Sequence, residues 1–229
     1  NFPSEKDNLK EFQVHQWKGL FFVGGNRYFS SVIDELERRI GWLKLEKFTH
    51  DESRYRDYEI KANWALYIDN YLEGFHIPFV HGDLHEILDY DSYKTELFEG
   101  GVLQIGIANE GEECFDLPDS SPDYGENIAA YYYWIFPGLM LNFYPWGLSV
   151  NIVNPISIDK TQIIYQGFVG NENLLGKGAG GNLDKVELED QDIVEATQRG
   201  VSSTSYERGR YSPSKEMGVH YFHRLLTGL

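Results

Sequence analysis

The chain has 229 residues, of which 41% are hydrophobic and 15% aromatic. These values fit a folded globular protein of one large or two small domains and exclude an intrinsically disordered chain. The formal net charge of −16 opposes contact with phosphate backbones, so we expect no nucleic-acid partner. Neither a secretory leader nor an apolar run of the roughly 18 residues that a membrane span needs is found, which predicts a cytoplasmic protein with no membrane partner.

The first half of the chain predicts a mixture of strands and helices. Ser31 and Asp34 have the spacing of a capping box, and the apolar residues after them recur at three- and four-residue steps, which predicts a surface helix with one buried face. The other expected elements are a strand over residues 12–24 that ends at Gly24-Gly25, a strand over 54–61, a helix over 64–75, and two strands within 94–109 joined at Gly100-Gly101.

The second half is richer in β-structure until its last quarter. Residues 110–127 are acidic and contain Pro and Ser, which indicates a surface loop or a lid. Residues 129–169 predict four strands of an antiparallel sheet, separated at Pro137-Gly138, at residues 145–147 and at residues 158–160. A long helix over residues 183–206 and a last helix from about Ser212-Pro213 complete an α+β chain.

Aromatic side chains are concentrated in the β-rich segment. They either line a ligand cavity or pack in the core, and for any one of them core packing is the more common role. The candidates for a cavity are Tyr131, Tyr133, Phe143, Tyr144 and Trp146.

Residues 63–83 place a carboxylate and two imidazoles close together in sequence, at Glu73, His76 and His81. A helical reading of residues 64–75 puts Glu73 and His76 on one face. Pro78 should end or kink that helix, and such a bend would let His76 and His81 share a cation. Two imidazoles and one carboxylate on one side of an ion are the ligands of non-haem Fe(II) oxygenases. The alternative is that both are ordinary helix-end histidines.

The motif NYLEGFHIPFVH closely resembles the mononuclear-iron motif of the Rieske non-haem iron oxygenases, the ring-hydroxylating oxygenase alpha subunits. Glu73, His76 and His81 match its acidic residue and its two histidines. The segment ELEDQDIVEATQRG resembles the one that supplies the third iron ligand of this family, which corresponds to Asp190 here. Glu187 and Asp192 differ from Asp190 only in register and stay as alternatives.

The resemblance covers nearly the whole chain and implies a helix-grip (START-like) fold, in which an antiparallel sheet wraps around a long C-terminal helix. It implies that His76, His81 and Asp190 bind mononuclear Fe(II) and that O₂ is activated there to hydroxylate or N-demethylate a small organic substrate. Glu73 would be the carboxylate that carries electrons from a Rieske cluster in a neighbouring subunit of a homotrimer, and Asn70 matches a residue close to the iron. A reductase or ferredoxin would be the electron donor.

Cys114 is the single cysteine, whereas a Rieske [2Fe–2S] cluster needs two Cys and two His. We therefore expect that residues 1–229 are the catalytic domain alone, a fragment inactive without its cluster domain and reductase. The lone cysteine also agrees with a reducing compartment.

The last residues, YERGRYSPSKEMGVHYFHRLLTGL, resemble the tail of the choline monooxygenase and betaine demethylase branch, which suggests a methylated ammonium substrate. Aromatic side chains would attract such a cation.

Other histidines could compete for a metal. His85 lies four residues beyond His81 and is the chief competitor, while His220 and His223 are expected to be structural. A second function also stays open, a non-enzymatic small-molecule carrier with the same fold and without iron.

Overall fold

The structure is a computed structural model that describes residues 2–23 and 28–228. The strands are β1 Val14–Trp17, β2 Leu20–Val23, β3 Thr49–Ile60, β4 Lys94–Phe98, β5 Gly101–Ile107, β6 Ile128–Ile135, β7 Leu139–Tyr144, β8 Gly147–Ser157 and β9 Lys160–Val169. The α-helices are α1 Phe29–Ile40, α2 Trp64–Leu72, α3 Ile77–Val80, α4 Gly82–Ile87, α5 Leu183–Val201 and α6 Met217–Thr227, and short 3₁₀ turns lie at Glu5–Asp7, Leu45–Lys47, Glu172–Leu174 and Gly178–Gly180.

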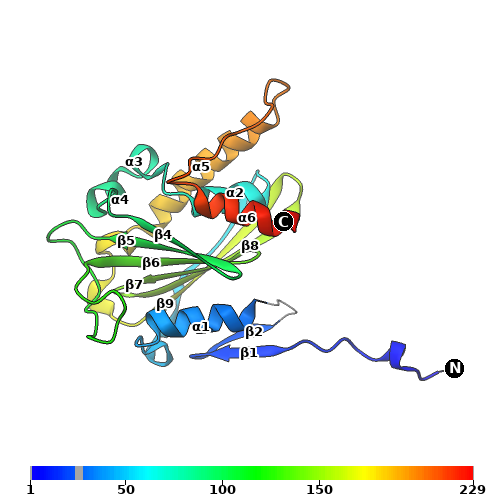
Figure 1. Ribbon diagram of the computed structural model, residues 1–229, viewed down its shortest axis with the longest axis horizontal. Helices are drawn as coiled ribbons and strands as arrows, with labels where there is room; N and C mark the ends of the chain where they lie inside the picture. The colour runs from blue at the N-terminus through cyan, green and yellow to red at the C-terminus, as the bar shows by residue number, and fades with distance from the viewer. Residues whose placement is uncertain (1, 24–27, 229) are drawn as a thin grey trace.

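A seven-stranded antiparallel sheet forms the centre of the molecule, in the order β3-β9-β8-β7-β6-β5-β4 (Figure 1). The four strands expected within residues 129–169 are β6 to β9, and each pairs with the next through a short connection. The sheet and the 19-residue helix α5 confirm the α+β prediction.

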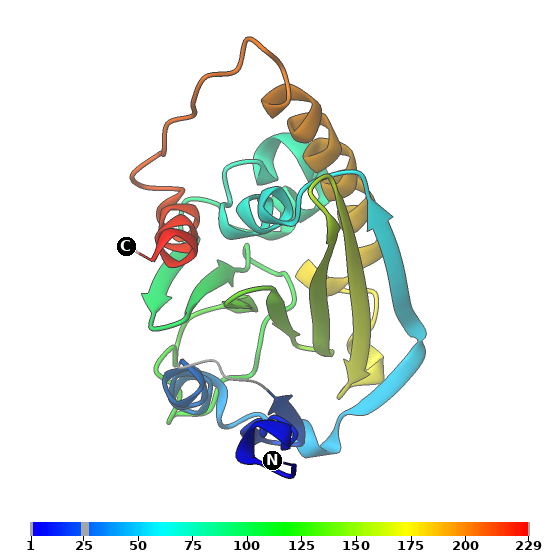
Figure 2. The same cartoon turned by 90° about the vertical axis from the view of Figure 1, so that its right-hand side faces the viewer.

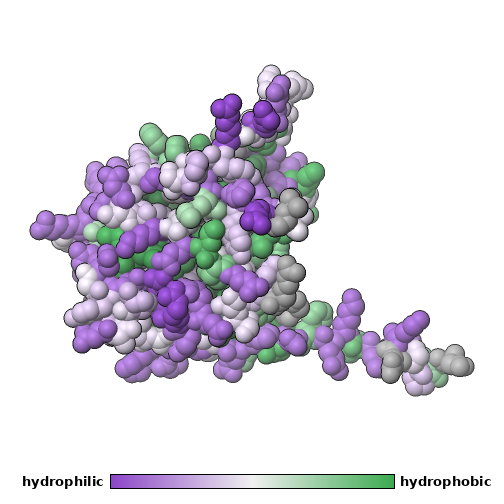
Figure 3. Space-filling model, in the orientation of Figure 1, coloured by the Kyte–Doolittle hydropathy of each residue, from purple (hydrophilic) through white to green (hydrophobic). Residues whose placement is uncertain are grey.

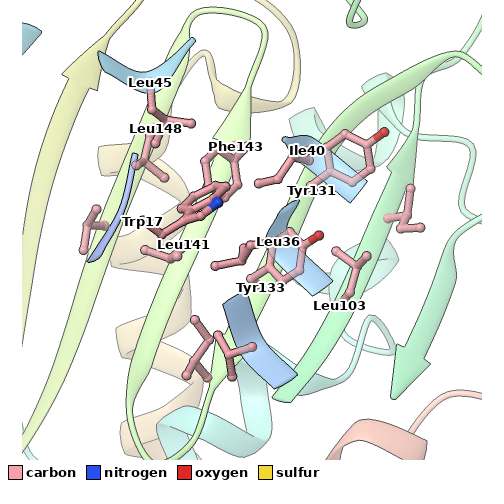
Figure 4. Packing of buried hydrophobic residues seen from close by; sticks show 14 of the residues in the cluster. Trp17, Leu36, Ile40, Leu45, Leu103, Tyr131, Tyr133, Leu141, Phe143 and Leu148 are labelled. Atoms are coloured by element: carbon pink, nitrogen blue, oxygen red, sulfur yellow. The ribbon is translucent and has the colours of Figure 1, made fainter. Parts of the chain in front are cut away.

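Helices cover both faces of this sheet. Helix α1 and the β1–β2 hairpin lie on one side, and α2, α5 and α6 lie on the other (Figures 1 and 2). Trp17, Leu36 and Ile40 fill the first layer together with the sheet residues labelled in Figure 4. Residues 202–216 run as an extended connection from the far end of α5 back to α6 (Figure 2).

Two local predictions near the N-terminus are wrong. Helix α1 begins at Phe29, two residues before the predicted cap Ser31, and its N-cap Tyr28 makes no side-chain cap hydrogen bond. The predicted strand over residues 12–24 is a hairpin, because Lys18 and Gly19 both adopt positive φ, the conformation of a two-residue hairpin turn. The predicted end at Gly24-Gly25 lies outside the described residues.

A buried ion pair ties the loop before β6 to helix α1. Arg39 Nη1 lies 2.6 Å from Asp123 Oδ1, both side chains are buried, and the Tyr131 hydroxyl donates to Asp123 Oδ2 over 2.8 Å. Removing one partner of such a pair leaves an uncompensated charge in the interior. Arg39→Met should therefore lower the free energy of unfolding by about 3–5 kcal/mol, measured by urea denaturation.

Arg38 provides the matched control on the same helix. Its side chain is 51% exposed and pairs with Glu35 at 2.7 Å. Because exposed ion pairs contribute about 0–1 kcal/mol, Arg38→Met should have little effect. Equal losses in the two variants would contradict a special role for the buried pair.

The surface seen in Figure 3 is mostly hydrophilic, in line with the strong negative charge of the chain. Among the described residues, no helix has both the length and the apolar character needed to cross a bilayer.

Candidate metal centre

Three side chains from distant parts of the chain meet between the α2–α4 segment and helix α5. His76 Nε2 lies 3.1 Å from His81 Nε2 and 3.4 Å from Asp190 Oδ1, and His81 Nε2 lies 3.1 Å from the same oxygen. All three ligand atoms are within 4.8 Å of one another. The structure thus brings together the three residues that the sequence singled out as metal ligands.

The secondary structure around Glu73, His76 and His81 differs from the prediction. Helix α2 ends at Leu72, and Glu73 is its extended C-cap, so Glu73 and His76 do not share a helix face. Pro78 does not end a longer helix; it is the second residue of the short helix α3, and a first turn tolerates its fixed φ and missing N–H. His76 and His81 flank this four-residue helix, and their rings converge at its side.

A glutamate contacts the Nδ1 atom of each imidazole, opposite the Nε2 atom that faces the other ligands. His76 Nδ1 lies 2.6 Å from Glu73 Oε1, and His81 Nδ1 lies 2.8 Å from Glu189 Oε2. An ionised carboxylate can only accept, so Nδ1 of each ring carries the proton. Carboxylates in this position behind metal-bound histidines fix the tautomer and the orientation of the ring.

When both imidazoles are neutral, their Nε2 atoms present lone pairs toward each other and toward the Asp190 carboxylate. Three such acceptors at these separations repel one another unless a proton or a metal ion lies between them. The donor set of two imidazoles and one carboxylate suits a first-row divalent metal, so these residues fit the iron that the sequence predicted.

Asp190 is positioned by both helices of the site. Asn70 on α2 donates from Nδ2 to Asp190 Oδ1 over 2.6 Å, so Asn70 lies beside the candidate metal ligands. The neighbouring Glu189 holds His81, so one turn of α5 contributes to the ligand set and to its support. The alternative Asp192 is exposed on the other side of α5.

Glu187, the second alternative to Asp190, serves a separate buried network. Its carboxylate accepts from the Tyr67 hydroxyl over 2.8 Å, from the Tyr165 hydroxyl, and from Gln191 over 3.2 Å. Burial raises the pKa of Glu187 well above its usual range, and the nearby charge of Asp190 acts in the same direction. This cluster could not be predicted from the sequence, because its residues come from α2, β9 and α5.

The other histidines do not join the centre. His85 is exposed, and its ring lies near Tyr90. His223 Nε2 lies 2.9 Å from Asp69 Oδ1, and its Nδ1 is 2.6 Å from the Tyr211 hydroxyl. These contacts agree with the structural role expected for His223.

Protons and metal ions compete for the same nitrogen atoms. Burial lowers the pKa of His76, but hydrogen bonds to Asp190 and Glu73 outweigh burial and raise it to about 9. For Asp190, burial raises the pKa, but the hydrogen bonds from His76 and His81 prevail and lower it to about 2. Burial lowers the pKa of His81, but the hydrogen bonds to Asp190 and Glu189 and the charge of Asp190 together outweigh burial, so the pKa is also raised.

A cavity of about 110 Å³ lies beside the three ligands. An engineered cavity of about 150 Å³ holds benzene, so this space suits a compact ligand. Tyrosines, amides and acids line the cavity, and none of the described residues around it is Lys or Arg. The six tyrosines are Tyr67, Tyr71, Tyr93, Tyr132, Tyr144 and Tyr165.

Five aromatic residues were predicted to line a cavity, and only Tyr144 lines this cavity. Tyr131, Tyr133 and Phe143 pack in the core on the α1 side of the sheet, and Trp146 packs beside Tyr144 behind the cavity wall. Successive side chains of a strand point to opposite faces, so Tyr132 faces the cavity where its two neighbours do not. The alternation was visible in the sequence, but which face carries the cavity was not.

Comparison with known proteins identifies the family. A family model described as the ring hydroxylating alpha subunit (catalytic domain) matches residues 45–227, which include every residue of the metal centre. The chain belongs to this family. The predicted resemblance to the Rieske non-haem iron oxygenases is thereby confirmed.

Relatives within this oxygenase family include two kinds of monooxygenase. A chloroplastic choline monooxygenase of Arabidopsis thaliana is 34% identical over 75% of this chain and 40% of its own length. The carnitine monooxygenase oxygenase subunit of Escherichia coli K12 is 27% identical over 99% of this chain and 63% of its own length. The chain therefore spans about 40–63% of the length of these two relatives.

Solved structures share the fold. The quaternary ammonium Rieske monooxygenase CntA, in complex with an inhibitor, has a TM-score of 0.72 at 21% identity and covers 95% of this chain and 60% of its own. Naphthalene 1,2-dioxygenase from Rhodococcus sp. has a TM-score of 0.66 at 15% identity and covers 94% and 65%. These matches confirm the helix-grip arrangement of the oxygenase catalytic domain.

Proposed function

We propose that residues 1–229 are the catalytic domain of a terminal oxygenase in which His76, His81 and Asp190 bind one mononuclear Fe(II). The observation that carries the proposal is the convergence of two Nε2 lone pairs and one carboxylate oxygen, with each Nδ1 held by a glutamate. Iron bound there would supply reductive activation of O₂. Hydroxylation and N-demethylation of a small organic substrate both use this ligand set.

The substrate class that the cavity supports is a small organic cation. Tyrosine faces attract cations, and desolvated pairs of this kind contribute about 2 kcal/mol. Asp190 adds an acidic group to a lining in which none of the described residues is Lys or Arg. Two relatives are named for choline and carnitine, which are both quaternary ammonium compounds.

Electrons would come from a Rieske [2Fe–2S] cluster in the full-length protein. Glu73 contacts His76 on its inner side and lines a surface hollow on its outer side, next to Phe75 and Phe79. Phe79 is 82% exposed, and an apolar surface of this kind suits docking of another domain. One solved relative is described in terms of inter-subunit electron transfer. We therefore place the cluster domain of a neighbouring subunit of a homotrimer at this hollow, with a reductase or ferredoxin as electron donor.

Titration with Fe(II) under anaerobic conditions tests the proposal. The chain should take up one equivalent of iron, measured by metal analysis after gel filtration. A non-enzymatic carrier would bind a small molecule in the cavity but has no reason to bind iron at these residues. Failure to retain iron would favour the carrier. A cytoplasmic location and the absence of a nucleic-acid partner stay predictions from composition.

Metal affinity should rise with pH. At pH 7 the Nε2 atom of His76 carries a proton, because its pKa is about 9, and the metal must displace that proton. Affinity should therefore increase about tenfold per pH unit up to about pH 9. Co²⁺ titrations followed by visible absorbance between pH 6 and 9 check this slope.

The metal-free fold should show the opposite trend. The pKa of His76 is higher in the folded chain than its ordinary value of 6.5, so its contribution to stability is complete below about pH 6.5 and is lost as the pH rises to about 9. A metal affinity independent of pH would contradict the pairing of His76 with Asp190 and Glu73.

A further inference from the structure

The connection between α5 and α6, residues 202–216, touches the rest of the molecule at few points. Its residues 202–211 are exposed, and the connection arches away from the helices in Figure 2. Among the described residues, the backbone of 207–211 makes no hydrogen bond, and Glu207, Arg208 and Arg210 form no ion pair. Segments with so few contacts open locally at a low cost in free energy. We call residues 202–216 the strap.

Tyr211 is the point at which the exposed part of the strap is fixed. Its hydroxyl lies 2.6 Å from His223 Nδ1 on α6, and its ring packs edge-on against His220 at a centroid distance of 5.1 Å. A hydroxyl can donate or accept, so this bond persists whichever nitrogen of His223 carries the proton. Within the part of the chain that the structure describes, no other side chain of residues 203–211 bonds to a helix or strand.

His223 is fixed in turn by helix α2. Its Nε2 lies 2.9 Å from Asp69 Oδ1, and this contact raises the pKa of His223 because the carboxylate favours the charged ring. Asp69 precedes Asn70, which donates to the candidate ligand Asp190. Tyr211, His223 and Asp69 thus connect the strap to the helix that supports the metal centre.

The strap forms a wall of a space outside the metal centre. This space has a volume of about 550 Å³, and Asn70, Glu73 and His76 line it together with residues 206–211 of the strap. It is distinct from the inner cavity of about 110 Å³, which none of the described strap residues lines. The strap therefore borders the metal centre from the side opposite to the inner cavity.

His76 is the candidate ligand that reaches this space. Of the three ligands, it alone lines both the inner cavity and the space under the strap, whereas His81 and Asp190 line only the inner cavity. Its side chain is 15% exposed, against 2% for His81. Glu73 Oε1 contacts His76 Nδ1 over 2.6 Å and lines the same space. Water that entered from the strap side would weaken this contact, because charges interact less strongly in water than in the interior.

We propose that the strap is a gate over the outer side of His76. Tyr211, His223 and Asp69 form the latch that keeps this gate closed. The closed gate shields the contact between Glu73 and His76 and blocks one route between the metal site and solvent. When the latch opens, water and metal ions pass by way of His76. This inference rests on the proposed function, because it needs a bound metal ion.

Metal exchange rates in Tyr211→Phe test the gate. This substitution keeps the ring and removes the hydroxyl that bonds to His223. Loss of one hydrogen bond should raise the population of the open strap about 2–10-fold, and Co²⁺ should bind and dissociate faster by that factor. Stopped-flow absorbance measures binding, and transfer of Co²⁺ to excess EDTA measures release. Because a gate speeds entry and exit equally, the dissociation constant should not change.

Tyr206→Phe is the matched control. Tyr206 lies on the same strap and is 48% exposed, close to 47% for Tyr211, but its hydroxyl has no hydrogen-bond partner among the described residues. This variant should exchange Co²⁺ at the unmodified rate. The backbone order parameters of residues 207–211 should fall in Tyr211→Phe and stay unchanged in Tyr206→Phe.

A double variant shows whether Tyr211 acts through His223. His223→Leu opens the same latch from α6, so it should also speed Co²⁺ exchange. Adding Tyr211→Phe to it should give no further increase, because residues that act through one contact do not contribute additively.

Unchanged exchange rates or unchanged order parameters in Tyr211→Phe would overturn the inference, as would equal acceleration in Tyr206→Phe. A weaker affinity that accounts for the faster release would also overturn it, because that result shows lost support of the ligands and no gate. The iron titration decides the proposed function separately. A chain that retains iron but shows none of these rate changes keeps the metal site and loses the gate.

Discussion

Asp190→Ala is expected to abolish iron binding and turnover. Three contacts converge on Asp190 Oδ1, from His76, His81 and Asn70, and the substitution removes the only carboxylate among the three converging ligands. Loss of a residue that merely orients a ligand weakens metal affinity about 10–100-fold, so loss of the ligand itself should exceed about 100-fold. Fe(II) titration of the variant under anaerobic conditions, with metal analysis after gel filtration, measures this loss.

Asp192→Ala is the control for this experiment. Asp192 lies two residues further along α5 and is exposed, so the substitution removes the same charge from the same helix without touching the centre. This variant should bind one equivalent of iron with unchanged affinity. Normal iron binding by Asp190→Ala, with the fold intact by circular dichroism, would contradict the ligand assignment.

Glu73→Gln is expected to retain iron but to slow electron delivery. The Gln side chain can still accept from the backbone N–H groups of Phe75 and His76, so the local backbone should hold its shape. The substitution removes the negative charge that faces His76 Nδ1 and links this ring to the surface hollow. We expect a decrease of roughly 10–100-fold in the rate of electron transfer, by analogy with other groups behind metal ligands.

This rate is measured in the full-length protein, which carries the cluster. After chemical reduction and mixing with O₂ and substrate, the absorbance of the cluster reports its oxidation in a single turnover. Glu189→Gln is the matched control, since Glu189 holds His81 in the same way but lies on α5, outside the hollow that Glu73 lines. An equal slowing in both variants would show that Glu73 supports the metal site without a special part in electron transfer.

Much of the centre could be predicted from short stretches of sequence. His76 and His81 are five residues apart around a proline, and the acidic start of α5 contained Asp190. The helical pairing of Glu73 with His76 was wrong, because the chain leaves helical geometry at Glu73. Gly74, directly after Glu73, favours the end of α2, and the contacts of the Glu73 carboxylate with two backbone N–H groups favour a turn there.

The cavity was harder to predict because it depends on tertiary packing. The tyrosine-rich strand β6 was correctly predicted as a strand, but its neighbours in the sheet decide which of its faces lines the cavity. Glu187 lies one turn from Asp190, and only the approach of Tyr67 and Tyr165 gives it a role distinct from that of a ligand. Contacts between residues 22 and 120 positions apart leave no periodic signal in one sequence.

The alternation of side chains along β6 has a practical consequence for directed evolution. Tyr131 and Tyr133 belong to the core layer that contains the buried ion pair of Arg39, whereas Tyr132 lines the cavity beside the candidate metal ligands. A library restricted to residues on the cavity face of the sheet, such as Gln104, Tyr132 and Asn142, would vary the lining of the cavity. It would leave the packing of the opposite layer, and the stability that this packing provides, unchanged. A shift of one residue in that choice would place the same substitutions in the buried core layer, where they would lower stability.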